Sequence, residues 1–348
     1  MDILLVFTQL TLGMLGVLGI ATSEASTGLI IRQTIAVFAG LGLTYTVARF
    51  SPKRIIKNSP LFYVITLLLL ILVLFIGSTP AGSAGKRWLL LGPISFQPSE
   101  LMKVAIIAYL TAFFYNHYGN WELWRPMLLV GAAVGLILLE PNFSTSLFIF
   151  YLAIAIMLIA GTRLVRLFSI GIASSIVALL FAIPLVGKYG YFVERISHFI
   201  NKNPEVYIGS QADLASRALR NAGFFGIGPG TARYVPEAHT DMIAISIAQA
   251  LGLTGIITVI ILYIFIAGRG VRIAAETRGP GSLLAAGATA YICSQAALNL
   301  LVASGLLPVT GVVLPFVSHG LNSMVSVSIA LGFLHSAYRQ ARLTGARL

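Results

Sequence analysis

Long apolar runs broken by short polar connections dominate the pattern of hydrophobic and polar positions along this 348-residue chain. A transmembrane helix needs about 20 consecutive apolar residues, and the pattern predicts about ten such helices. They are expected at 3–21, 33–50, 60–78, 100–117, 126–141, 143–161, 168–186, 241–267, 282–306 and 320–337. The sequence therefore predicts an all-α integral membrane protein with a single polytopic domain over residues 1–348.

The composition agrees with this pattern and excludes a soluble globular protein. Hydrophobic residues make up 57% of the chain and charged residues only 10%, and the mean hydropathy is +0.92. Cys293, the one cysteine, lies in an apolar run, which excludes a disulfide framework. Only Met1 and Asp2 precede the first run, without a basic region or a clear cleavage pattern, so we expect a retained span.

The distribution of lysine and arginine predicts the orientation. With the N-terminus in the cytoplasm, most basic residues fall in inner connections, and the short outer ones hold only Arg32, Lys86 and Arg87. Both termini are then cytoplasmic, and one long extracytoplasmic loop covers about 187–240. The net charge of +12 follows from this topology, and no basic stripe interleaved with aromatic residues indicates a nucleic-acid partner.

Three polar segments fall on the outer side, so any chemistry is expected there. They are "STPAGSAGKRWLLLGPISFQPSE", the loop at about 187–240, and "GLLPVTGVVLPFVSHGLNS". Two stretches of the long loop, "YFVERISHFI" and "ADLASRALRNAG", are amphipathic, which is typical of short helices at a membrane interface. A long loop with such patterning is usually functional.

The stretch "PEAHTDM" places Glu237, His239 and Asp241 within five residues before an apolar helix. One interpretation is structural, because Thr240 can cap the helix and a carboxylate in its first turn is stabilised by the helix dipole. The other is catalytic, with Asp241 as a general base and with Glu237 and His239 tuning it or holding substrate.

The stretch "QPSELMK" places Glu100 and Lys103 on one face of the helix expected at 100–117. Ionisable groups inside a membrane are costly and usually face a cavity or a bundle interior. They are candidates for substrate binding or for a structural ion pair. Just upstream, Arg87 can bind a phosphate or lie at the interface as an ordinary arginine.

Two further groups of polar residues are candidates. Gln295 and Asn299 share one face of the helix at 282–306, where they bind substrate or join helices by hydrogen bonds. In "LPFVSHGLNS", Ser318 and His319 form part of a polar lining without an adjacent carboxylate. The chain has no cluster of metal-ligand residues, and its glycine-rich "GFFGIGPG" follows no strand, so nucleotide binding is not indicated.

The blocks "GKRWLLLGPISFQPSELMK", "EPNFSTS", "PEAHTDM" and "GLLPVTGVVLPFVSHG", in this order, resemble the SEDS family (shape, elongation, division and sporulation) of peptidoglycan glycosyltransferases. The likeness covers essentially the whole chain. The motif "PVTG" and the absence of a cytoplasmic N-terminal extension favour the elongation branch, RodA, over the division branch, FtsW.

This resemblance implies a polymerase of the bacterial cytoplasmic membrane that joins lipid II units and releases undecaprenyl diphosphate. It implies a class B penicillin-binding protein as partner, and lipid as the surroundings. The essential aspartate of the family falls on Asp241, and the membrane-facing cleft residues fall on Arg87, Glu100 and Lys103. A lipid II flippase and a non-catalytic scaffold for the transpeptidase are the alternatives.

The chain departs from the family pattern at several polar positions. Asn142 and Ser144 replace an aspartate and a glycine, and Gln249 and Ala250 replace two acidic residues. These changes remove possible ligands for a metal, so no cofactor is assigned and a divalent cation is left open.

Overall fold

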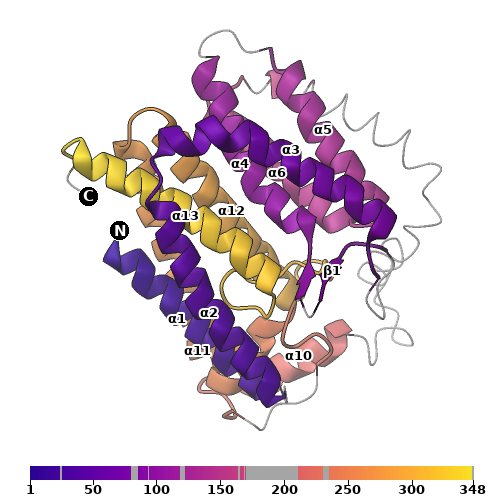
Figure 1. Ribbon diagram of the computed structural model, residues 1–348. Coiled ribbons are helices and arrows are strands. Elements are labelled where there is room, and N and C mark those ends of the chain that lie inside the picture. The colour runs from indigo at the N-terminus through magenta and orange to yellow at the C-terminus, as the bar shows by residue number, and fades with distance from the viewer. Residues whose placement is uncertain are drawn as a thin grey trace.

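A computed structural model describes residues 1–23, 26–79, 85–92, 94–117, 122–163, 165–167, 169, 211–229 and 235–346. They form a bundle of long helices with one small hairpin (Figure 1). The helices are α1 Ile3–Thr22, α2 Thr27–Ala48, α3 Pro52–Ile76, α4 Pro98–Asn116, α5 Trp124–Leu139, α6 Phe143–Ile159, α10 Gln211–Ala222, α11 Ile243–Glu276, α12 Pro280–Ala303 and α13 Leu321–Leu343. The strands are β1 Leu89–Leu91 and β2 Ile94–Phe96.

Most of the predicted spans coincide with helices. Among the described residues, α1, α2, α3, α11 and α12 are long and apolar enough to cross a membrane, and α5 and α6 are shorter apolar helices. Large apolar side chains such as Phe7, Phe38 and Phe75 are exposed on the first three, as lipid-facing surfaces require. The span expected at 168–186 lies outside the described residues, so the count of ten spans and the placement of both termini stay predictions. The single polytopic domain over residues 1–348 also stays a prediction.

Helix α4 is the centre of the bundle. It packs against α3, α6, α12 and α13, and nearly every residue along it is buried. A helix without a solvated face has no polar side on which to place charges. The two ionisable residues in its first turns therefore need partners from neighbouring helices.

A hairpin leads directly into α4, and the all-α prediction missed it. Leu89 pairs with Phe96 in an antiparallel register, and Gly92 in the turn has a φ of 63°, which glycine adopts without strain. Asn322 at the start of α13 holds this segment: its Oδ1 accepts from the Gln97 amide at 3.2 Å, and its Nδ2 donates to the Ser95 carbonyl at 2.8 Å. Strands of three residues are too short for an alternating hydrophobic pattern to be recognised between long apolar runs.

The boundary between α5 and α6 falls where Pro141 predicted it. Proline cannot continue the hydrogen-bonded ladder of a helix, and α5 ends at Leu139. The Asn142 side chain then caps α6 by accepting from the Thr145 amide at 3.4 Å. Asn142, which departs from the family pattern, thus has a structural role.

Helix α11 is broken at Gly252, whose φ of 68° and ψ of −155° are accessible only to glycine. The break frees backbone groups, and the loop after α10 satisfies them. The Ile227 amide donates to the Gln249 carbonyl at 2.8 Å, and the Leu253 amide donates to the Gly223 carbonyl at 3.1 Å. The glycine-rich "GFFGIGPG" segment therefore completes a discontinuous membrane helix.

The second amphipathic stretch of the loop expected at about 187–240 forms the helix α10, as predicted. Its buried side carries Ala215, Ala218 and Ala222, and it packs against α11 (Figure 1). The first stretch, "YFVERISHFI", and the rest of the loop up to residue 210 lie outside the described residues.

Candidate active site

The ion pair of Glu100 and Lys103 lies in the first turns of α4. Lys103 Nζ is 2.6 Å from Glu100 Oε1, and both residues are buried, with exposed fractions of 4% and 8% for Lys103 and Glu100. The rings of Phe148 and Tyr291 each lie 5.6 Å from the ammonium group. The aromatic faces and the carboxylate together stabilise a cation in an apolar surrounding.

Polar groups of α12 and α13 complete this pair. Lys103 donates to Gln295 Oε1 at 3.0 Å, and the Ser326 hydroxyl donates to Glu100 Oε2 at 3.2 Å. The Tyr291 hydroxyl lies 2.9 Å from the Ser326 hydroxyl. The sequence singled out Gln295 but not Ser326, Tyr291 or Phe148, because serines and aromatic residues are common in apolar spans.

Asp241 lies before α11 rather than in its first turn, so that part of the sequence prediction was wrong. The helix begins at Ile243, and its N-cap, Met242, makes no side-chain hydrogen bond. Residues 237–242 form a series of turns. The Thr240 hydroxyl donates to Glu237 Oε2 at 2.7 Å, so Thr240 is not the cap of the helix.

Side chains from α12 and from the segment 304–320 hold this turn. Asn299 Nδ2 donates to the Asp241 carbonyl at 2.8 Å and to the Val312 carbonyl at 2.6 Å. The Ser318 hydroxyl donates to the Thr240 carbonyl at 2.7 Å. Side chains 58 and 78 residues further along the chain therefore fix the backbone around Asp241.

The Asp241 side chain faces the segment 304–320. An added Cβ on Gly311, whose φ is 72°, would lie 3.3 Å from Asp241 Oδ2. The residue is partly exposed. No sequence pattern marked Gly311, because its proximity to Asp241 arises only in the fold.

A continuous polar path joins Asp241 to the buried ion pair. Asn299 and Gln295 lie one helical turn apart on α12, and Gln295 Nε2 donates to the Val313 carbonyl at 3.1 Å while its Oε1 accepts from Lys103. The interpretation of this pair as interhelical hydrogen bonding fits these contacts. Asn299 contacts the Asp241 backbone and Gln295 contacts the ion pair, so both belong to one site.

Arg87 contacts the α5–α6 connection, while Glu237 and His239 lie in the turn that carries Asp241. Arg87 Nε donates to the Glu140 carbonyl at 3.0 Å, and its Nη2 donates to the Pro141 carbonyl. Glu237 is exposed. The His239 carbonyl accepts from the His319 amide at 2.8 Å.

Burial changes the pKa of two groups in the connections around the site. Burial raises the pKa of the Glu140 carboxyl to about 8, although the charge of Arg87 opposes the change. Neither carboxylate oxygen of Glu140 has a hydrogen-bond partner within the described residues. Burial, with the charges of His239 and Arg32, lowers the pKa of the His319 imidazole.

Within the described part of the chain, no three histidine, cysteine, aspartate or glutamate side chains come close enough to form a metal site. The sequence left a divalent cation open, and these residues assign it no ligands.

Comparison with known proteins places these observations in one family. The family model "Cell cycle protein", which covers FtsW, RodA and SpoVE, matches residues 2–343. The "Probable peptidoglycan glycosyltransferase FtsW" of Coxiella burnetii is 33% identical over 322 residues, covering 87% of this chain and 84% of that protein. The "Stage V sporulation protein E" of Bacillus subtilis is 32% identical over 297 residues, covering 82% and 80%.

Two solved structures share the fold. One, from work on the structural coordination of polymerization and crosslinking by a peptidoglycan synthase complex, superposes with a TM-score of 0.80 at 26% identity and covers 97% of each chain. The crystal structure of the rod shape determining protein RodA of Thermus thermophilus gives a TM-score of 0.71 at 25% identity, covering 96% of this chain and 95% of that one.

Proposed function

The chain belongs to the FtsW/RodA/SpoVE family, and on that premise we propose that it is a peptidoglycan glycosyltransferase that polymerises lipid II. It is a multi-pass protein of the bacterial cytoplasmic membrane. The observation that carries the proposal is the turn at Asp241, which Asn299 and Ser318 anchor and which a polar path connects to the buried Glu100–Lys103 pair.

In the proposed reaction, Asp241 acts as the general base. The acceptor sugar hydroxyl attacks the anomeric carbon of the donor, its proton passes to the Asp241 carboxylate, and the bond from the anomeric carbon to the phosphate oxygen breaks. Undecaprenyl diphosphate leaves with the electron pair of that bond. A single carboxylate base and a direct displacement produce inversion at the anomeric carbon, in contrast to the two-carboxylate retaining glycosidases.

A diphosphate leaving group needs positive charge rather than a proton donor. Lys103 supplies an ammonium group that Glu100 and Gln295 orient, and Arg87 supplies a guanidinium group at the α5–α6 connection. Preorganised cations in a site of low dielectric constant stabilise developing negative charge more strongly than water does. Glu237 and His239 are proposed to contact the sugars at the outer edge. Ser318, predicted from the sequence to bind substrate, is buried with its hydroxyl on the Thr240 carbonyl and positions the turn instead.

The partner is proposed to be a class B penicillin-binding protein that crosslinks the product. Support comes from the structural neighbour in the peptidoglycan synthase complex, which combines polymerization with crosslinking. We also propose a role in cell elongation. The similarity to the solved RodA structure favours it, whereas the relatives at 30–33% identity mostly carry the FtsW name.

The test is lipid II polymerisation by the purified protein, reconstituted with a transpeptidase whose own chemistry is blocked. Wild type is expected to make glycan strands, and Asp241→Asn is expected to make none while it retains its thermal stability and its partner. Glu122→Gln is the matched control, since Glu122 is an exposed carboxylate paired with Arg125. A normal rate for Asp241→Asn would refute the assignment of the base.

Lipid flipping by the same samples separates the alternatives. A flippase would transport lipid II in wild type without making strands. A scaffold would do neither, yet would raise the crosslinking activity of an unblocked transpeptidase in a parallel sample.

A further inference from the structure

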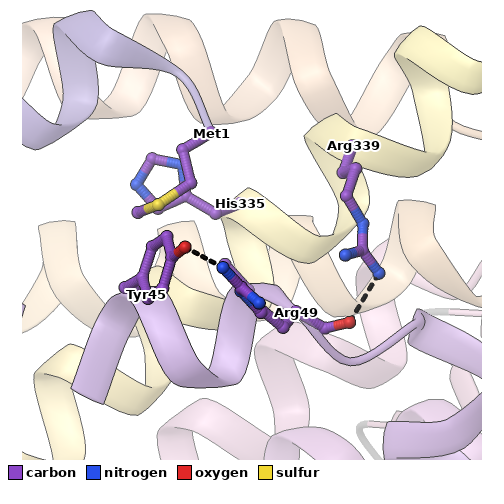
Figure 2. Close-up of a pocket in the computed structure, with 6 residues that line it drawn as sticks. Met1, Tyr45, Arg49, His335 and Arg339 are labelled. Atoms are coloured by element: carbon purple, nitrogen blue, oxygen red, sulfur yellow. Dashed lines mark hydrogen bonds between the residues drawn. The ribbon is translucent and has the colours of Figure 1, made fainter. Parts of the chain in front are cut away.

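A pocket of 180 Å³ lies where the start of α1 meets the C-terminal ends of α2 and α13, at the opposite end of α11 and α13 from Asp241. Figure 2 shows its labelled lining side chains. The lining residues are Met1, Tyr45, Ala48, Arg49, His335 and Arg339. This end of the bundle is the predicted cytoplasmic side, so the pocket is separate from the polymerisation site.

Two guanidinium groups border the pocket. Arg339 Nη2 donates to the Arg49 carbonyl at 2.7 Å, and Arg49 Nη2 donates to the Tyr45 hydroxyl while its Cζ lies 4.6 Å from the Tyr45 ring centroid (Figure 2). These contacts position the cations without neutralising them. Among the residues that the structure describes, neither arginine forms an ion pair with a carboxylate.

The nearby acid is already paired. Asp2 Oδ2 accepts from Arg269 Nε, and Asp2 Oδ1 accepts from the Leu4 amide at 3.1 Å. The local charge of the pocket therefore comes from Arg49, Arg339 and the N-terminal amine of Met1.

His335 adds a hydrogen-bond donor. Its side chain is fully buried, and its Nδ1 accepts from the Asp2 amide at 3.2 Å. A neutral imidazole that accepts at Nδ1 carries its proton on Nε2, so Nε2 is a donor. Within the described residues this Nε2 has no hydrogen-bond partner. A buried donor without a partner is unfavourable, so an acceptor in the pocket would be stabilised.

The guanidinium groups of Arg49 and Arg339 and the Nε2–H of His335 are suitable hydrogen-bond donors for the oxygens of a phosphate group. Arginine binds phosphate through two parallel charge-assisted hydrogen bonds, and basic pockets between helices at the cytoplasmic side of a membrane protein are suited to anionic headgroups. We propose that this pocket binds a phosphate group, supplied by an anionic phospholipid of the inner leaflet.

The lipid test uses the full-length protein in nanodiscs that contain phosphatidylcholine with phosphatidylglycerol, and native mass spectrometry counts the phosphatidylglycerol retained. The double variant Arg49→Gln/Arg339→Gln is expected to lower the affinity about tenfold or more, since each lost pair of hydrogen bonds to a charged group weakens binding by about that factor. The matched control is Arg272→Gln/Arg342→Gln, which removes two exposed arginines of the same side. It is expected to retain the lipid.

A second arm separates the two sources of phosphate. In detergent without added lipid, the thermal midpoint is compared in sodium phosphate and sodium chloride at equal ionic strength. Stabilisation by phosphate that needs Arg49 and Arg339 would support the site with soluble phosphate as a ligand. Loss of phosphatidylglycerol alone in the pocket variant would support the lipid as the source.

The conservative variant Arg339→Lys keeps the charge but removes the fork, and it is expected to give an intermediate loss of lipid. It also serves where the double variant does not fold. Equal lipid loss in pocket and control variants would show general attraction to the inner leaflet and would overturn the proposal. So would lipid and phosphate binding that is independent of both pocket arginines.

Discussion

Asn299 donates a hydrogen bond of 2.8 Å from its side-chain amide to the backbone carbonyl of Asp241. The same amide nitrogen donates to the Val312 carbonyl. One side chain of α12 thus ties together the turn before α11 and the segment before α13. The position of the proposed base depends on this contact, because the turn has no regular secondary structure to hold it.

Asn299→Ala is therefore expected to reduce lipid II polymerisation about 10- to 100-fold, since a small displacement of a catalytic group has effects of this size. The free energy of unfolding should fall by about 1–3 kcal/mol, because two part-buried carbonyls lose their donor. Polymerisation rates and chemical denaturation measure the two effects. Ser304→Ala, at the exposed end of the same helix, is the control, and equal activity of the two variants would contradict the positioning role.

The buried ion pair predicts a different result for single and double substitutions. Lys103→Met leaves the Glu100 carboxylate buried and unpaired, which should cost about 3–5 kcal/mol of stability. The double variant Glu100→Gln/Lys103→Met removes both charges and should recover most of that stability. Polymerisation should be lost in both variants, because the cation for the leaving group is gone. Recovery of activity in the double variant would assign the pair a structural role alone.

The break in α11 is expected to tolerate no side chain at Gly252. An added Cβ would lie 2.3 Å from the Gly226 nitrogen and 2.3 Å from the Phe224 oxygen, and the backbone conformation alone costs an alanine about 1–3 kcal/mol. Gly252→Ala should lower the thermal midpoint and expose the loop at 223–227 to proteolysis. Gly268→Ala on the same helix has open space around it. It should be neutral or more stable, by about 1 kcal/mol.

Glu140 predicts a dependence of stability on pH. Burial raises the pKa of its carboxyl from 4.5 to about 8 in the folded protein, so the native state keeps a proton that the unfolded chain releases. The contribution to the free energy of unfolding is therefore fully present below pH 4.5 and is lost as the pH rises through about 8. Glu140→Gln, which stays neutral, should flatten this slope. Denaturation curves at several pH values test it, and an unchanged slope would contradict the assignment.

The apolar runs were sufficient to predict most of the helices. Their existence follows from composition, because a lipid environment leaves the backbone few alternatives to helices. The helix α10 was predicted for a related reason, since its amphipathic pattern is local. The sequence also identified four candidate site residues, because such polar side chains are rare in apolar spans. They are Glu100, Lys103, Gln295 and Asn299.

Contacts between distant segments could not be predicted in this way. The contact of Gly311 with Asp241 and the hydrogen bonds from Asn322 to the segment before α4 join parts of the chain that are tens or hundreds of residues apart. Hydrophobic periodicity reports which residues are buried in a helix, but it carries no information on which helix buries them. The pairing of Asn299 with Asp241 exists because α12 packs beside α11, and packing geometry, not local pattern, brings the two residues together.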